Sequence, residues 1–173
     1  DLRNIADRKR TGVLFVPLTE DVLKLNGLLV EQANTLALTV HTDAGAFIDM
    51  TQVVLAKVIL FNRKRQGEVS KMKVEDYRKK RFAQSSELDL ALTEFERGLL
   101  KVFERVEIRG KRGRTVPLLL TEEMKTWIDK LLAARPSFVP AQNPFLFACK
   151  GEYSHLRGSD ALITFALDCG TQR

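Results

Sequence analysis

The sequence is poor in the residues that build metal centres and disulfide frameworks. Its 173 residues include two cysteines and two histidines, which cannot supply a disulfide framework or, by themselves, a four-ligand zinc site. We therefore expect Cys149 and Cys169 to be reduced thiols in an intracellular protein. Because His41 and His155 stand alone and no carboxylates cluster near them, we expect no metal and no cofactor.

Long apolar runs and a phosphate-binding glycine loop are also missing, and we do not expect secretion from the opening residues. No uninterrupted apolar stretch approaches the ~20 residues that a membrane span needs. The first residues, 1–4, carry charge in place of an apolar signal core. A Walker-type loop is not present, so a P-loop ATPase is unsupported. We expect neither a membrane partner nor a nucleotide cofactor, and the apolar content of 45% suits one compact domain.

Positive charge is concentrated in two short windows of the chain. Residues 61–81 contain nine Lys or Arg and three acids, and residues 105–114 contain five and one. The whole chain has a net charge of +6, so the remaining residues carry −4. Such clustering is typical of proteins that bind a polyanion, nucleic acid first. Two solvated basic faces without a ligand are the alternative.

The spacing of apolar residues predicts several helices. Residues 19–38 follow the three- and four-residue spacing of an amphipathic helix that Thr19 can cap. Residues 46–62 are apolar on nearly every side, which predicts a helix surrounded by protein. A turn of helix is expected after Val74, and a capping-box-like start at Ser86 predicts a helix to about residue 103. Residues 1–18 form a basic lead-in to these elements.

The second basic window falls on a predicted β-hairpin. Residues 105–109 alternate in polarity, 110–113 form a two-glycine tip, and 114–118 resume an extended run. Pro117 cannot donate to a strand ladder, so it must lie at an edge or face away from a partner. A helix over 121–135, a short strand over 145–148 and a last helix capped by Ser159 follow. We predict an α+β domain over residues 19–173, mostly helical with a small antiparallel sheet.

The order of four motifs resembles that of a known family. The core helix leads into Arg65-Gln66-Gly67-Glu68, and the hairpin runs from Gly110-Lys111-Arg112 to Val116-Pro117-Leu118. The runs Asn143-Pro144-Phe145-Leu146-Phe147-Ala148 and Arg157-Gly158-Ser159-Asp160 come later. Together, over about residues 19–170, they resemble the catalytic domain of tyrosine recombinases, the phage-integrase family. The likeness is closest to the versions carried by eukaryotic Crypton-type transposons.

The resemblance implies double-stranded DNA as the partner and a reaction that forms a 3′-phosphotyrosine link without metal or nucleotide. It matches Arg65 to the first catalytic arginine and Lys111 to the hairpin lysine that acts as general acid. A guanidinium fork fits two phosphate oxygens, and an ammonium can give up a proton. Since hairpin tips slip in register, Arg112 could stand in place of Lys111. The other cations expected to contact the DNA backbone are Arg63, Lys64, Lys71, Lys73, Arg109, Arg112 and Arg114.

The sequence also departs from the family pattern. The His-x-x-Arg segment, the later His or Trp and the nucleophilic tyrosine do not occur in their expected places. Tyr77, in a segment predicted to enter a strand, and Tyr153, before the last helix, are each expected to pack with an exposed hydroxyl. His155 lacks the His-x-x-Arg spacing and is expected to make a loop contact. The chain therefore resembles the front part of a catalytic domain, whether truncated, missing a tail or decayed, and we do not expect it to cut DNA alone.

Three functions remain open at this point. The chain is a recombinase-derived DNA-binding domain, a non-catalytic DNA-binding or chromatin-associated module that reuses the fold, or a protein–protein interaction domain with an acidic partner. Arg65 could be a helix-end charge paired with Glu68, and Lys111 a simple phosphate contact or surface lysine. The likeness to eukaryotic transposon recombinases also implies nuclear residence and allows self-association on DNA.

Overall fold

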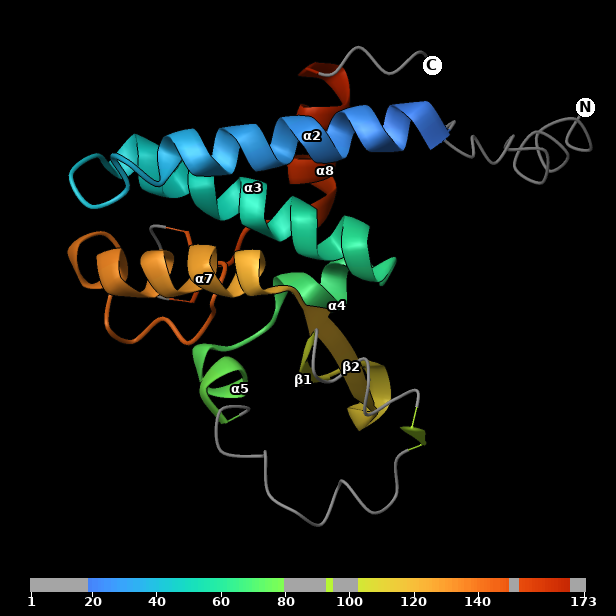
Figure 1. Cartoon of the computed structure of the whole chain (residues 1–173). Helices are drawn as coiled ribbons and strands as arrows, with labels where there is room; N and C mark the ends of the chain where they lie inside the picture. The colour runs from blue at the N-terminus through green and yellow to red at the C-terminus, as the bar shows by residue number, and fades with distance from the viewer. Residues whose placement is uncertain (1–18, 80–92, 95–102, 150–152, 169–173) are drawn as a thin grey trace, which may run out of the picture.

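The structure is a mostly helical α+β fold with one two-stranded antiparallel sheet, as the sequence predicts (Figure 1). The computed structural model describes residues 19–79, 93–94, 103–149 and 153–168. The predicted lead-in 1–18, most of the predicted helix 86–103 and the exit of the last helix lie outside the described residues. The elements are α2 (Thr19–Leu36), α3 (Ala44–Asn62), α4 (Gln66–Ser70), α5 (Val74–Lys79), β1 (Glu104–Arg109), β2 (Thr115–Leu120), α7 (Glu122–Ala134) and α8 (Gly158–Asp168).

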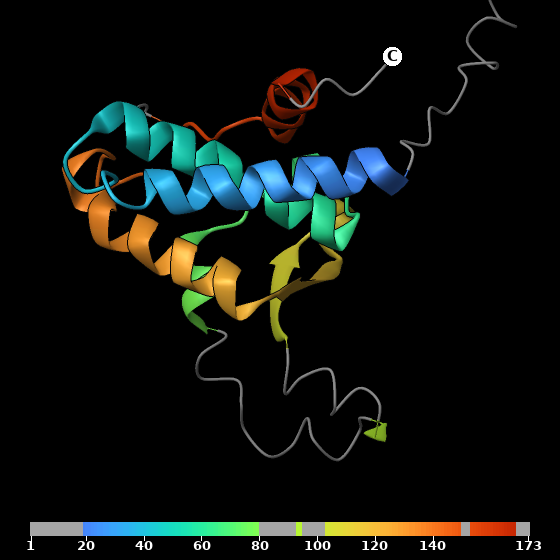
Figure 2. The same cartoon turned by 45° about the horizontal axis from the view of Figure 1, so that its top comes forward.

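Helix α3 is the centre of the fold. It contacts α2, α4, α7 and α8, and eleven of its nineteen residues are buried. In Figure 2, α8 lies above α2 and α3, whereas α7 and the hairpin lie below them. The helix begins two residues earlier than its apolar pattern predicts, because the Asp43 side chain accepts the Gly45 N–H at 2.7 Å and caps it.

The apolar character of α3 comes from this central position. Among the described residues it is the one helix that is long and apolar enough, by length and composition, to cross a membrane. Within its most apolar stretch, 61% of the residues are buried inside the protein. Neighbouring helices therefore account for the apolar surface of α3, which is the pattern of a core helix.

Helices α4 and α8 are held together by side chains of α4 that cap α8. The Ser70 hydroxyl accepts the Gly158 N–H at 2.9 Å and donates to the Gln66 carbonyl oxygen at 2.7 Å. The Gln66 side-chain oxygen accepts the Ser159 N–H at 3.2 Å. The prediction that Ser159 caps α8 is therefore wrong, because Ser159 lies inside the first turn and α4 satisfies the free N–H groups.

The short strand predicted over 145–148 consists of two isolated bridges. Lys73 pairs with Phe145, and Ala148 pairs with His155. The guanidinium of Arg135 donates to the carbonyl oxygens of Asn143 and Phe145. This side chain occupies backbone acceptors that a continuous ladder would use, so the segment is anchored to the end of α7 without forming a regular strand.

The first prediction concerns the close contact between α8 and α4. A Cβ atom on Gly158 would lie 2.5 Å from Ile59 Cδ1, 2.9 Å from Gln66 Cβ and 3.0 Å from Ser70 Oγ. Gln66 Cβ cannot move without the α4 backbone, so Gly158→Ala should lower the free energy of unfolding by about 1–3 kcal/mol. Gly67→Ala is the control, since a Cβ there meets nothing within 4 Å and alanine favours a helix. Urea unfolding checks both, and equal effects would contradict the contact.

The second prediction concerns Lys57, the only charged side chain that is buried among the described residues. Its ammonium donates to Asn26 Oδ1, and burial lowers the pKa of Lys57, with a partial offset from Glu123. Between the lowered folded pKa and the unfolded value of about 10.4, the unfolded chain binds more protons, so stability should rise with pH. Lys57→Met should remove this rise.

Urea unfolding between pH 7 and pH 10 measures the effect as the difference between the variant and the original chain. Lys130→Met is the control, because Lys130 is an exposed lysine on α7. Parallel pH dependences for Lys57→Met and the original chain would show that the buried ammonium does not titrate differently on unfolding.

Candidate nucleic-acid interface

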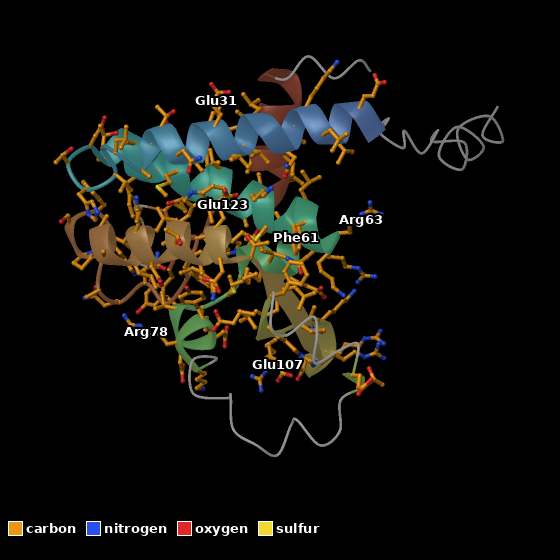
Figure 3. All side chains as sticks on the ribbon, in the orientation of Figure 1. Glu31, Phe61, Arg63, Arg78, Glu107 and Glu123 are labelled. Atoms are coloured by element: carbon orange, nitrogen blue, oxygen red, sulfur yellow. The ribbon has the colours of Figure 1, made fainter. Side chains whose placement is uncertain are left out.

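Three consecutive cations occupy the turn between α3 and α4. Arg63 ends α3 in the left-handed conformation, with φ 50° and ψ 34°. Arg65 is the residue before α4 and has an extended backbone, with φ −61° and ψ 119°. Arg63, Lys64 and Arg65 are all exposed, and Figure 3 shows Arg63 projecting outward from the end of α3. The core helix therefore delivers three cations to one surface turn.

The base of the β-hairpin is fixed to the end of α3 by Asn62. Its Nδ2 donates to the Leu119 carbonyl oxygen at 2.9 Å, and its Oδ1 accepts the Leu119 N–H at 2.7 Å. The amide thus takes the place of a further strand along the open edge of β2. The rings of Phe61 and Phe103, the latter just before β1, add an aromatic contact with centroids 5.6 Å apart.

The tip of the hairpin is brought to α4 by Glu68. Glu68 Oε1 accepts the Lys111 backbone N–H at 3.4 Å, and it would lie 3.2 Å from a Cβ on Gly110. Arg65 is three residues before Glu68, less than one helical turn away. The two elements that carry Arg65 and Lys111 are therefore neighbours. Sequence reasoning gave Glu68 only as a partner for Arg65 and missed Asn62, because one polar residue at the end of an apolar helix carries no distinctive signal.

The hairpin reverses through a tight turn that exposes three cations. Gly110 N–H donates to the Arg114 carbonyl oxygen at 2.7 Å, and Arg114 N–H approaches the Lys111 carbonyl oxygen at 3.5 Å. Arg112 (φ 59°, ψ 29°) and Gly113 (φ 74°) both have positive φ, which is typical of a type I′ turn. Lys111, Arg112 and Arg114 are exposed. The predicted hairpin is confirmed, with strands one or two residues longer at its base.

Pro117 fits the pairing as the sequence predicts. It lies opposite Glu107 in the register. Because Gly110 and Arg114 form a hydrogen-bonded pair, the alternation of an antiparallel ladder makes 108/116 and 106/118 the bonded pairs. Position 117 therefore faces the outer edge of β2, where a missing N–H does not interrupt the sheet.

The cations of α5, at the end of the first basic window, do not share this surface. In Figure 3, Arg78 on α5 lies on the other side of the molecule from Arg63. Lys79 forms an ion pair with Glu75 at 2.6 Å, in which both side chains are solvent-exposed. Lys71 and Lys73 are exposed on the segment between α4 and α5, and Arg109 is exposed on β1. The structure thus brings together the cations of the α3–α4 turn and the hairpin tip, and leaves those of α5 apart.

Tyr77 and His155 occupy structural positions, whereas Tyr153 is exposed. Tyr77 lies on helix α5, so its predicted place at a strand entry is wrong. It is 3% exposed, and its hydroxyl donates to Asp129 Oδ1 at 2.9 Å, which also corrects the expected exposed hydroxyl. Tyr153 is 71% exposed, so the expected packing of its ring is wrong. His155 packs against Phe145 with ring centroids 4.9 Å apart, a loop contact. Within the described ranges, no three His, Cys, Asp or Glu side chains are grouped as metal ligands would be.

Comparisons with known proteins find solved structures with a similar fold. A scan against protein-family models and a search of curated proteins each find no match. Among solved structures, the chain is similar to the XerH site-specific recombinase bound to palindromic difH substrate, a post-cleavage complex, with a TM-score of 0.56. It is also similar to the pre-cleavage XerH complex with difH substrate, with a TM-score of 0.57. In both cases the identity is 16%, and the match covers 90% of this chain and 36% of the recombinase chain.

These similarities establish the fold. The chain has the fold of part of a tyrosine-recombinase catalytic domain, as the order of motifs predicts. It spans about a third of the length of the recombinase chains that it matches.

The third prediction tests the link between α3 and the hairpin. In Asn62→Asp a carboxylate still accepts the Leu119 N–H, but it cannot donate to the carbonyl oxygens of Leu119 and Val58, which Asn62 Nδ2 now approaches at 2.9 and 3.0 Å. We expect the free energy of unfolding to fall by about 1–3 kcal/mol in urea titrations. Asn34→Asp is the control, because it makes the same charge change at a side chain that accepts a hydrogen bond, from Trp127 Nε1 at 3.2 Å. A carboxylate can still accept that bond. An equal loss in Asn34→Asp would argue against the paired amide contact.

Proposed function

We propose that this chain is a DNA-binding, recombinase-derived domain, in which residues 19–173 correspond to part of a tyrosine-recombinase catalytic domain. The observation that carries the proposal is the contact between Glu68 and the Lys111 backbone N–H. This contact makes the turn after α3 and the hairpin tip neighbours, and the two segments together carry six basic residues. The similarity to XerH complexes supports the same assignment.

The chemistry of this surface suits the backbone of double-stranded DNA. Arginine presents a planar fork that matches two phosphate oxygens, and lysine supplies a mobile point charge. In the proposed arrangement Arg65 stabilises the charge on the phosphate at the centre of the site, and Lys111 is the hairpin cation that can donate a proton. The flanking backbone contacts come from Arg63, Lys64, Lys71, Lys73, Arg109, Arg112 and Arg114.

We propose DNA binding without strand cleavage for the 173 residues given. Neither tyrosine suits the role of nucleophile on this surface. The Tyr77 hydroxyl is engaged by Asp129, and Tyr153 lies in the segment before α8. A tyrosine attacks a phosphate only when its hydroxyl is free and held in line with the leaving oxygen. Complete homologues cut and rejoin DNA with residues that this sequence does not contain.

The likeness to Crypton-type recombinases supports a eukaryotic, nuclear setting as part of the proposal. Two motifs behind that likeness hold the fold together. Asn143 is buried, donates to the Ser154 carbonyl oxygen at 2.8 Å and accepts the Phe145 N–H at 3.0 Å. Gly158 allows the close approach of α8 to α4. These contacts explain the two residues by their structural roles, so the branch assignment is supported by the likeness in sequence alone.

The fourth prediction is salt-dependent binding to duplex DNA. Fluorescence anisotropy with a labelled 30-base-pair duplex should show log K falling linearly with log salt. Arg65→Ala and Lys111→Ala should each weaken binding about five-fold near 0.15 M salt, the contribution of one phosphate contact, and reduce the slope by about 1. Lys24→Ala, an exposed lysine on α2, removes the same charge elsewhere and should change binding little.

Two further readouts separate the alternatives. Denaturing gels of the same mixtures should show no covalent protein–DNA adduct, and an adduct that survives denaturant would mean that this chain contains a working nucleophile. If Arg65→Ala and Lys111→Ala bind DNA as the original chain does, the DNA-binding proposal fails. An acidic protein partner would then be the better explanation of the charge.

A further inference from the structure

Two arginines occupy backbone conformations that arginine disfavours. Among the described residues, Arg63 (φ 50°) and Arg112 (φ 59°) are the only non-glycine residues with positive φ. An L-residue in the left-handed region suffers a close approach between Cβ and the backbone, which glycine avoids and asparagine tolerates better. Both residues with a disfavoured backbone conformation are therefore arginines, and both lie in the segments that form the basic surface described above.

At each of these two positions the local backbone structure favours a residue other than arginine. Arg63 ends α3, where glycine or asparagine is the usual left-handed residue after a helix. Arg112 is the first central residue of the type I′ turn, where asparagine before glycine is strongly preferred, and Gly113 does follow it. Neither arginine side chain is buried, so core packing does not explain the choice of residue.

The two arginines also flank the residues matched to the recombinase pattern. Arg63 is two residues before Arg65, and Arg112 directly follows Lys111. Glu68 brings the two turns together. Backbone strain is concentrated at functional sites, where a side chain is worth more in that place than the stability it forgoes. An exposed guanidinium at a strained turn, beside further cations, has phosphate as its natural ligand.

We infer that Arg63 and Arg112 are paired phosphate-binding residues that grip the nucleic-acid backbone on either side of Arg65 and Lys111, at the expense of the stability of the two turns. The inference rests on the proposed function and adds to it. It assigns phosphate binding to the two arginines in the left-handed conformation. It also predicts that replacing their side chains raises the stability of the folded chain and weakens its binding to DNA.

The fifth prediction follows from this opposition. Arg63→Gly and Arg112→Asn keep the turns and relieve the backbone, so each should raise the midpoint of thermal unfolding by about 2–4 °C. Each should also weaken binding to a 30-base-pair duplex about five-fold at 0.15 M salt, the contribution of one phosphate contact. Arg63→Lys and Arg112→Lys keep the charge and the strain but lose the fork, so they should leave the midpoint unchanged and weaken binding less.

Arg78→Ala is the matched control. It removes an arginine from the same basic window but from α5, on the other side of the molecule from Arg63 (Figure 3). We expect no rise in the midpoint of unfolding and little change in duplex binding. The control separates a local phosphate contact from a general effect of net charge.

The outcomes distinguish the inference from the proposed function. If Arg63→Gly and Arg112→Asn bind as the original chain does while Arg65→Ala and Lys111→Ala bind weakly, the inference fails. The DNA-binding function then stands without contacts from Arg63 and Arg112. A lower midpoint of unfolding in Arg63→Gly or Arg112→Asn also overturns the inference, because the turn is then not strained by arginine. If the original chain itself shows no salt-dependent binding to the duplex, the proposed function fails and the inference fails with it.

Discussion

The candidate surface depends on how the hairpin is fastened to the end of the core helix. Asn62 holds both backbone groups of Leu119 at the base of the hairpin, and Glu68 holds the Lys111 N–H at its tip. Both side chains come from a seven-residue stretch that continues directly from α3. Because α3 is buried on most sides, these hydrogen bonds hold the segments that carry the exposed cations in a fixed position against the core. Binding groups held in this way need little ordering when a ligand arrives.

Helix α4 is too short to be stable alone, so it depends on its neighbours. Five residues barely complete one turn, and isolated helices of this length do not persist in water. Ser70 and Gln66 bond to the first N–H groups of α8, which are 88 and 93 residues away in the chain. Each helix therefore satisfies the polar groups of the other. The position of Glu68, and with it the hairpin tip, follows from this exchange between α4 and α8.

Elements with local signals could be predicted from the sequence. Apolar spacing located α2, α3 and α7, and Thr121 caps α7 by accepting the Met124 N–H at 3.2 Å, as predicted. Alternation and the glycine-bounded tip located the hairpin. These features depend on residues within a few positions of one another, and they account for most of the described fold.

The features that sequence reasoning missed depend on distant partners. Ser159 has the residue type of a cap, but Gln66 and Ser70 satisfy the N–H groups at that helix start. Residues 145–148 have strand-like composition, but Arg135 takes the carbonyl oxygens on one side. No local pattern reports such contacts. Arg65 and Lys111 also depend on distant partners. The structure shows that their two elements are neighbours, and their catalytic roles stay predictions.

The like charges of the basic surface repel one another in the free protein, and this repulsion favours binding of a negatively charged partner. The turn over 63–68 and the tip over 110–114 carry six cations and one carboxylate, Glu68. Like charges at such spacing repel one another and destabilise the folded state, more strongly at low salt. Two of these cations also sit in disfavoured backbone conformations. The described part of the fold tolerates both penalties at one place, and binding of a polyanion there would relieve the repulsion and stabilise the native state.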